Sequence, residues 1–405
     1  MKLLIADKFE QSGINALTAL GCSVALHPDC SGSDLPGVVT SEMPDVLIVR
    51  STKVSAEAMD ACPGMNLIIR AGAGYDTIDV QAASARGVFV SNCPGKNAIA
   101  VAELTWGHIL CCDRRIPDQT AELKAGTWNK KEYSKAAGLH GRVLGIVGLG
   151  DIGREVAARG RAFGMRVVAW SRSLTPESAA AQQVEFAASP LEVARQADVV
   201  SVHVAATNET KRLINDAFIE AMKPGAFLIN TSRGSVADEA AIEHGIKAKG
   251  IRAGLDVFNN EPGAADNRFA CAIATQPGVS TTHHIGASTE QAQEAIAAEV
   301  TRIVSHYLRT GAAMNCVNLA KSTPAVCVLT VRMKNEPGVL AHVFYLLGQG
   351  RLNVEEMDNV VYDGAKAACA HIQLDKAPDD EILKAIRANN NVVSATVAML
   401  KGHSI

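Results

Sequence analysis

The sequence has little net charge and no long apolar run. Its 405 residues include 39 basic and 42 acidic side chains, so neither a nucleic acid nor a charged membrane surface is expected as a partner. No segment stays apolar for the roughly 20 residues that a membrane-spanning helix needs. Asp7 follows the first apolar residues too soon for a signal peptide. We therefore expect a soluble cytoplasmic protein.

The cysteines lack the spacing of a metal site or of a disulfide framework. There are ten of them, scattered along the chain, with Cys111 and Cys112 adjacent. This usage is typical of reduced thiols in a cytosol and predicts no metal. Because 48% of the residues are hydrophobic, the chain can bury substantial cores in two or three domains.

Residues 142–172 have the pattern of a strand, a glycine turn, a helix and a second strand. Residues 142–147 are apolar, residues 155–163 have helical spacing, and residues 165–170 are apolar again. Gly148 permits a tight bend, Gly150 lets the backbone approach a pyrophosphate, and Gly153 lets the helix pack closely on the strand. The helix N-terminus would then face the phosphates of a dinucleotide. A plain glycine-rich turn is the less favoured interpretation, because strand and helix are both present.

The end of the second strand leaves the choice of dinucleotide open. An acid about 20 residues past the glycines would bind the ribose hydroxyls and repel a 2′-phosphate. Ser171 and Arg172 stand there instead, and a hydroxyl and a guanidinium can both bind a phosphate. Arg172 could equally be a solvated charge, or stack on adenine while NAD binds. The cofactor is therefore NAD or NADP.

Residues 1–94 alternate strands and helices, which predicts a small parallel α/β domain. Arg50 and Arg70 each end a strand, at the edge where open α/β sheets bind ligands. Two cations there favour an anionic substrate, and a turn with Gly72 and Gly74 could add backbone N–H donors. The alternative is that both arginines pair with surface acids. The next helix, over residues 98–112, should be buried between domains, with Pro117 as the stop.

Polar side chains follow successive strands between residues 197 and 284. Parallel strands bring such residues to one crevice. Hydride transfer at a carbonyl carbon needs a proton partner for the oxygen, and a histidine suits this task. Arg233 could hold a carboxylate and polarise the carbonyl, with Glu261 orienting the ring of His284. Each residue alone has an ordinary structural interpretation, but the set beside a dinucleotide turn favours catalysis.

Residues 148–153, 230–234, 254–262 and 284–289 resemble the D-isomer-specific 2-hydroxyacid dehydrogenases. The resemblance covers nearly all of residues 1–318. It implies a Rossmann-type doubly wound cofactor domain (95–285) inserted into a flavodoxin-like substrate domain (1–94 and 286–318), and a homodimer or homotetramer. The catalytic Arg, Glu and His of the family fall on Arg233, Glu261 and His284.

The same resemblance implies contacts with the cofactor and with a small 2-hydroxy acid. The cofactor-binding residues would be Gly148, Gly150, Asp151, Ile152, Gly153, Ser171, Arg172, His203, Val204, Thr210, Thr231, Asp256 and Gly286. The substrate-binding residues would be Arg50, Lys53, Arg70, Ala73, Gly74 and Asn97.

Three positions depart from the family pattern. Members usually have a proline where this chain has His283, and His284 is taken as the catalytic residue because it keeps the Ile-Gly neighbours. A proline is also replaced by Ala205 after His203, which loosens a loop near the nicotinamide ribose. The usual acid of NAD-using members is Ser171 here, which leaves the cofactor in doubt.

Residues 319–405 have a βαββαβ pattern of their own, which suits an antiparallel sheet with helices on one face. They resemble the ACT domain, a small-ligand module. Together with the dehydrogenase motifs, this tail resembles most the family branch that oxidises 3-phosphoglycerate to 3-phosphohydroxypyruvate, the first step toward L-serine. The asparagines that bind L-serine in inhibited members match Asn335 and Asn353, while the accompanying histidine is Met333.

Two other functions stay open. One is an NADP-linked glyoxylate or hydroxypyruvate reductase, or another D-2-hydroxyacid dehydrogenase, which Ser171 and Arg172 would suit. The other is a non-enzymatic sensor of the nicotinamide ratio. The intact set of Arg233, Glu261 and His284 disfavours the sensor, because a sensor needs no proton relay.

Overall fold

The structure is a computed structural model, and it describes residues 1–262 and 268–400. The chain divides into two compact units, Met1–Asn318 and Leu319–Ile405. The first unit contains two parallel sheets, each covered by helices on both faces, and the second contains an antiparallel sheet. This is the α/β class that the alternating pattern predicts.

The first sheet is built from the N-terminal residues. Its strands are short and almost wholly apolar because both faces are covered. The strand order is β2-β1-β3-β4-β5, which is the flavodoxin-like order. The strands are β1 (Lys2–Ile5), β2 (Ser23–Leu26), β3 (Val46–Val49), β4 (Leu67–Arg70) and β5 (Phe89–Ser91). The helices α2 (Leu35–Glu42), α3 (Ala56–Asp60) and α4 (Val80–Ala85) cover one face, and α1 (Gln11–Ala19) and α13 (Glu290–Thr310) cover the other.

The second sheet has the order β12-β11-β10-β9-β6-β7-β8, with every pair parallel. Its order reverses between β6 and β9, which is the point where a doubly wound sheet binds its ligand. The strands are β6 (Val143–Val147), β7 (Arg166–Trp170), β8 (Glu185–Phe186), β9 (Val199–Val202), β10 (Phe227–Asn230), β11 (Arg252–Leu255) and β12 (Val279–Thr281). The predicted Rossmann-type fold is therefore confirmed.

Two layers of helices enclose this sheet. One face is covered by α5 (Ala98–Arg114), α8 (Asp151–Ala162) and α9 (Pro176–Ala181), and the other by α10 (Pro190–Gln196), α11 (Asp216–Ala221) and α12 (Glu239–Lys249). The shorter elements are α6 (Ile116–Lys124), α7 (Lys130–Tyr133) and the 3₁₀ turns η1 (Gly234–Val236) and η2 (Ile273–Thr275).

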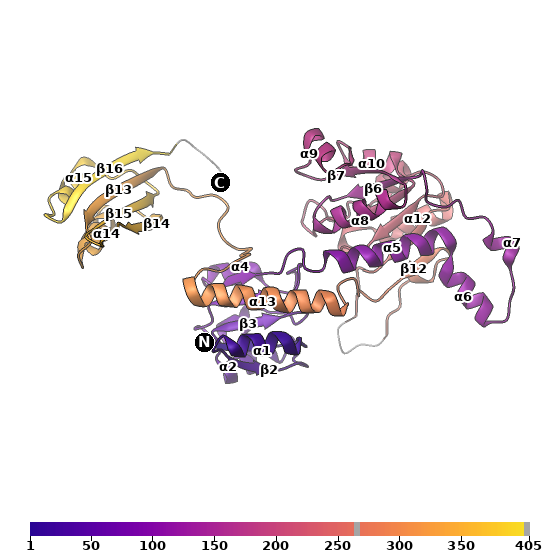
Figure 1. The fold of residues 1–405 in the computed structure, drawn as a ribbon, viewed down its shortest axis with the longest axis horizontal. Coiled ribbons are helices and arrows are strands. Elements are labelled where there is room, and N and C mark those ends of the chain that lie inside the picture. The colour runs from indigo at the N-terminus through magenta and orange to yellow at the C-terminus, as the bar shows by residue number, and fades with distance from the viewer. Residues whose placement is uncertain (263–267, 401–405) are drawn as a thin grey trace. The chain divides into compact units, whose positions relative to one another are not determined.

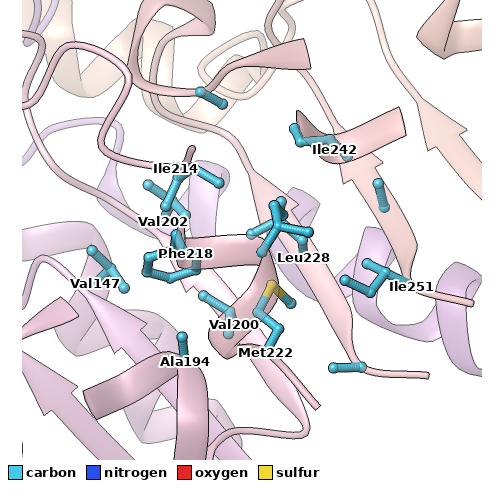
Figure 2. Packing of buried hydrophobic residues seen from close by; sticks show 14 of the residues in the cluster. Val147, Ala194, Val200, Val202, Ile214, Phe218, Met222, Leu228, Ile242 and Ile251 are labelled. Carbon is cyan, nitrogen blue, oxygen red and sulfur yellow. The ribbon is translucent and has the colours of Figure 1, made fainter. Parts of the chain in front are cut away.

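The core of the second sheet is a continuous set of buried aliphatic and aromatic side chains. Val200 and Leu228 of the strands lie beside Phe218 and Met222 of the α11 segment (Figure 2). Burying a side chain of this size contributes roughly 1.5–3 kcal/mol. This packing fixes the strand ends that carry the site.

Two helices connect the sheets of the first unit. The chain leaves the first sheet through α5 and returns through α13, which lies along α1 (Figure 1). The sequence predicted both helices, and α5 ends at Arg114, just before Pro117, as expected; a second helix, α6, which the sequence did not indicate, starts there. Arg115 turns at φ +51°, and Pro117 lies in the first turn of α6, where its missing N–H costs nothing.

The glycine turn leads into its helix earlier than the apolar spacing predicted. α8 begins at Asp151 rather than near residue 155, because Gly150 is extended and serves as the N-cap. Its first turn, residues 151–154, has one large apolar side chain, Ile152, so a pattern of apolar residues could not detect it. The N–H groups of α8 therefore lie directly after the glycines.

The second unit has the predicted βαββαβ order. Its sheet is antiparallel, in the order β14-β15-β13-β16, and its core includes residues of both helices. The elements are β13 (Cys327–Lys334), α14 (Val339–Gln349), β14 (Val354–Val361), β15 (Ala367–Leu374), α15 (Asp380–Arg387) and β16 (Val392–Met399). Across the described parts of both units, every helix is too short or too polar to cross a bilayer.

Candidate active site

The glycine turn after β6 leaves room in front of α8. Gly148 has φ +103°, and a Cβ there would lie 2.8 Å from the backbone of His203. A Cβ on Gly153 would lie 2.3 Å from the carbonyl oxygen of Gly148. Around Gly150, in contrast, no described atom lies within 4 Å of the Cβ position. Two glycines thus close the turn, while the third faces open space.

This geometry fits a dinucleotide pyrophosphate. The first N–H groups of α8, from Asp151 and Ile152 onward, have no partner inside the helix, and an anion can satisfy them. The side chain of Asp151 points elsewhere and pairs with Arg154. The helix dipole favours negative charge at the same place.

At the end of β7, Ser171 is half-buried and Arg172 is exposed. Arg172 takes part in none of the ion pairs found within residues 1–262 and 268–400. Hydrogen bonds from Thr207 and from the Glu209 backbone chiefly lower the pKa of Glu209, and the charge of Arg172 adds to this shift. Its guanidinium is thus available to a ligand at this strand end.

The loop after β9 holds a neutral histidine. Nε2 of His203 lies 2.7 Å from Oγ of Ser201, and burial lowers the pKa of the ring to about 3. Its Nδ1 is buried and has no partner among the described residues. The hydroxyl of Thr210 donates to the carbonyl of Ala205, so it closes the loop that continues from Val204.

Arg233 follows β10 and lies across the turn at Gly74. Its Nε donates to Asp76 at 2.8 Å, and a Cβ on Gly74 would lie 1.8 Å from its terminal nitrogen. Only glycine at this position leaves space for the guanidinium. The sequence analysis did not select Asp76. A signal was present, because Asp76 lies two residues past Gly74, in a turn that was predicted to bind a ligand.

Arg70 is a partly buried cation beside the same turn. Burial, with the positive charges of Arg233 and Arg50, lowers the pKa of the Arg70 guanidinium to about 10. It remains charged at neutral pH, yet its Nε has no hydrogen-bond partner within the described chain. A Cβ on Gly72 would collide with it at 1.5 Å. A partly buried cation whose Nε lacks a partner can be satisfied by an anionic ligand.

A buried acid, Asp7, accepts hydrogen bonds from the backbone of the loop after β3. Asp7 accepts the N–H groups of Arg50 at 2.6 Å and of Ser51 at 3.1 Å. The side chain of Lys53, on the same loop, is exposed. Asp7 lies just past β1, so the rule that selected Arg50 and Arg70 from strand ends could have selected it too.

Two other predicted substrate contacts lie near the crossing into α5. The carbonyl of Ala73 accepts a hydrogen bond of 2.6 Å from the side chain of Asn92. Asn97 is the N-cap of α5, but its side chain makes no cap hydrogen bond. Its Oδ1 is buried and unpaired among the residues described. Oδ1 of Asn97 is therefore a hydrogen-bond acceptor that has no donor among the described residues.

His284 and Glu261 form a hydrogen-bonded pair. Nδ1 of His284 lies 2.7 Å from Oε2 of Glu261, and Oε1 of Glu261 accepts the N–H of Phe258 at 2.9 Å. Burial raises the pKa of Glu261, but these two hydrogen bonds outweigh it and lower the pKa overall. His283 is exposed and has no such partner in the described chain. The pair leaves Nε2 of His284 for a ligand.

Asp256 lies beneath the loop that carries His284. Its carboxylate is 1% exposed and accepts the N–H groups of Ile285 and Gly286, each at 2.9 Å. Both side-chain oxygens of Asp256 thus support the loop that carries His284, and the contact with the nicotinamide that the sequence predicts stays a prediction. Thr231 is likewise buried and bonds to Thr105 of α5 at 2.9 Å.

In the second unit, Asn335 follows β13 and Asn353 precedes β14. The amide of Asn335 donates to the carbonyl of Ala365 at 3.0 Å, and that of Asn353 to Glu355 at 2.7 Å. Met333 is 3% exposed and packs in the core of this unit. It therefore cannot take the place of a ligand-binding histidine.

A dinucleotide turn, a His–Glu pair and a cationic turn on one α/β scaffold are the parts that a nicotinamide-dependent dehydrogenase requires. Comparison with known proteins agrees with this class. Residues 106–286 match the family "D-isomer specific 2-hydroxyacid dehydrogenase, NAD binding domain". The chain belongs to the D-isomer-specific 2-hydroxyacid dehydrogenases.

Three relatives illustrate the range of this family. D-3-phosphoglycerate dehydrogenase of Methanocaldococcus jannaschii is 37% identical over 79% of this chain, and the chain spans only 60% of that protein's length. Hydroxypyruvate reductase of Thermotoga maritima is 40% identical over 63% of this chain and 82% of its own. NADPH-dependent glyoxylate/hydroxypyruvate reductase of Sinorhizobium meliloti, solved with NADP and malonate, has a TM-score of 0.67 and 26% identity, covering 78% of this chain and 96% of its own.

Proposed function

We propose that this chain is a D-3-phosphoglycerate dehydrogenase. It would transfer a hydride between 3-phosphoglycerate and a nicotinamide dinucleotide, giving 3-phosphohydroxypyruvate on the way to L-serine. The observation that carries the proposal is the pair of guanidiniums, Arg70 and Arg233, on one glycine turn, where Asp76 pairs with Arg233 and Nε of Arg70 has no partner among the described residues. A substrate with both a carboxylate and a phosphate would match this excess of positive charge.

The proposed chemistry assigns one task to each side chain. The nicotinamide, when bound, accepts or supplies the hydride. Arg233 binds the carboxylate of the substrate and polarises the reacting carbonyl. His284 takes the hydroxyl proton on Nε2, and Glu261 stabilises the imidazolium through Nδ1. In reduction the proton moves back from His284 to the oxygen.

The other contacts are proposals at the same level. Arg50, Lys53 and Arg70 would surround the phosphate, and Asn97 would accept a hydrogen bond from the substrate through its unpaired Oδ1. The cofactor would lie on the turn of Gly148, Gly150 and Gly153, between the loops after β7 and β9.

A steady-state comparison tests the substrate. We expect the highest kcat/KM with 3-phosphoglycerate, measured against hydroxypyruvate and glyoxylate, each with NAD(H) and NADP(H). A preference for glyoxylate or hydroxypyruvate of tenfold or more, an estimate of roughly 1.4 kcal/mol, would reject the proposed substrate while leaving the family membership intact.

A second candidate is an NADP-linked glyoxylate or hydroxypyruvate reductase. It is favoured by Ser171 and the available Arg172 at the end of β7, where an acid would repel a 2′-phosphate. The S. meliloti reductase, with its NADPH requirement, supports the same alternative. The assay above separates the two candidates by substrate and by cofactor in one set of measurements.

We infer further that the second unit binds L-serine through Asn335 and Asn353. We also infer that the protein is a homodimer or homotetramer. It would work in the cytoplasm, where its ten unpaired cysteines stay reduced. Isothermal titration with L-serine should give a heat of binding and inhibition of turnover. The absence of both would reject the effector. Sedimentation equilibrium reports the assembly state.

A further inference from the structure

A buried histidine on α5 lies between two hydroxyl groups near the end of β12. His108 is 2% exposed. Its Nδ1 lies 3.1 Å from Oγ of Ser280, and its Nε2 lies 3.0 Å from Oγ1 of Thr282. Gly254 on β11 makes this possible, because a Cβ there would lie 2.6 Å from Cβ of His108. The helix can therefore bring the ring onto the sheet edge.

The hydrogen-bond partners fix which ring nitrogen carries the proton. Oγ1 of Thr282 donates to Oδ1 of Asp256 at 2.6 Å, since a carboxylate can only accept. A hydroxyl has one proton, so Thr282 must accept from His108. His108 is thus protonated on Nε2, and its bare Nδ1 accepts the proton of Ser280. Burial lowers the pKa of His108 although Asp256 opposes the shift, which agrees with a neutral ring.

The chain of hydrogen bonds continues into the catalytic loop. Asp256 accepts the N–H groups of Ile285 and Gly286 with its two side-chain oxygens, and the N–H of His284 with its backbone oxygen at 2.8 Å. His284 has φ +54°, a left-handed conformation that a non-glycine residue adopts at a cost. Asp256 therefore supplies the contacts that hold this conformation.

We propose that His108 is a positioning residue: its Nε2–H holds Thr282, which orients Asp256 and so fixes the loop that presents His284. His108 is too deeply buried to touch a ligand, and it acts only through this chain of hydrogen bonds. The kinetic part of the proposal rests on the proposed function, because it needs a substrate that is turned over.

Two amide substitutions separate hydrogen bonding from packing. Gln at position 108 can place its amide nitrogen where Nε2 lies and donate to Thr282, while Asn is too short to reach Thr282. We expect His108→Gln to keep kcat within about threefold and His108→Asn to lower it about tenfold to a hundredfold, since misplacement by about 1 Å can cost that much. The KM for the nicotinamide cofactor should stay within about twofold in both.

The exposed His244 gives a matched control, because its substitution by Asn should leave kcat unchanged. Melting curves verify that each variant is folded. Equal kcat values for His108→Gln and His108→Asn would overturn the proposal, whether both stay at the wild-type value or both fall, because hydrogen bonding to Thr282 would then make no difference.

Nitrogen-15 NMR of the histidine-labelled protein tests the tautomer without any turnover. The signals missing in His108→Gln identify His108, and we expect a neutral ring with the proton on Nε2 at pH 7. A proton on Nδ1 would overturn the inference. If the wild-type protein turns over no 2-hydroxy acid, the proposed function fails, but the NMR result still decides the hydrogen-bond direction.

Discussion

Buried carboxylates support both loops that carry the reactive side chains. Asp7 accepts the N–H groups of the loop with Arg50, and Asp256 accepts those of the loop with His284. Charge-assisted hydrogen bonds of this kind contribute roughly 1.5–3 kcal/mol each. These backbone N–H groups are therefore already used, while the side chains on both loops can still meet a ligand. The acids thus fix the geometry while the cations and the histidine remain available.

The choice between adjacent histidines gives a prediction at this scale. We expect His284→Ala to lower kcat by about two to four orders of magnitude, because it removes the general acid and base. His283→Ala is the matched control and should stay within about twofold, since His283 does not contact Glu261. Stopped-flow turnover with the preferred substrate measures both. If only His283→Ala caused a large loss of kcat, the acid and base would be His283, and our choice of His284 would be wrong.

We expect the residue after β7 to set the preference between NAD(H) and NADP(H). Ser171→Asp should shift kcat/KM toward NAD(H) over NADP(H) by about tenfold to a hundredfold, because a carboxylate there repels a 2′-phosphate. Ser173→Asp, two residues further along, is a control that adds the same charge. If the ratio of the two kcat/KM values stays constant in Ser171→Asp, then no 2′-phosphate lies near Ser171 or Arg172.

At the scale of elements, the sequence predicts features that depend on local backbone geometry and misses those that depend on distant contacts. Alternating apolar runs and the spacing of Gly148, Gly150 and Gly153 predict the doubly wound fold, because both depend on local backbone geometry. The functions of Asp76, Asp7 and His108 depend instead on contacts across the sheets, with partners far apart in sequence. Asp7 precedes Arg50 by 43 positions, so no local pattern predicts their contact.

The start of α6 shows that even a local sequence signal can be ambiguous. Proline inside a helix is destabilising, so the sequence favoured a stop at Pro117. The left-handed turn at Arg115 separates α5 from α6 and puts the proline in a first turn. A proline therefore predicts a helix boundary correctly but does not tell whether the boundary is an end or a beginning.

Helix α13 depends on a buried acid, and this gives a prediction of stability against pH. Glu299 is 3% exposed, accepts from Asn315 at 2.8 Å, and pairs with Lys96 at 3.3 Å. Hydrogen bonds from Arg302 chiefly lower the pKa of Glu299 from 4.5 to about 2. As the pH falls, the Glu299 carboxylate is therefore protonated in the unfolded chain before it is protonated in the folded one. The stabilisation is complete above pH 4.5 and disappears as the pH falls toward 2.

We expect Glu299→Gln to lower the free energy of unfolding at pH 7 by roughly 3 kcal/mol, from the size of the pKa shift. Urea denaturation at a series of pH values measures the difference from wild type. It should shrink steadily below pH 4.5. Glu294→Gln, an exposed position on the same helix, is the control. A difference that does not depend on pH would show that Glu299 acts through packing and not through its charge.

At the scale of the molecule, each unit has hydrophobic clusters of its own among the described residues. Those of the first unit, with the partly buried side chains packed against them, extend to Val317, and the cluster of the second begins at Cys327. Each unit therefore has its own hydrophobic driving force, as independently folding domains do. The residues proposed for catalysis all lie in the first unit, and those proposed for an effector lie in the second.

This separation predicts the behaviour of a fragment that ends at Asn318. Since its cores are complete, the fragment should melt cooperatively and keep kcat within about threefold of the full chain. Inhibition by L-serine, measured at saturating substrate and cofactor, should be present in the full chain and absent in the fragment. The variant Asn353→Ala of the full chain is the control, because it should lose inhibition with the second unit still present. A fragment that folds but has no turnover would mean that catalysis requires the second unit, and inhibition that persists in the fragment would place the effector site among residues 1–318.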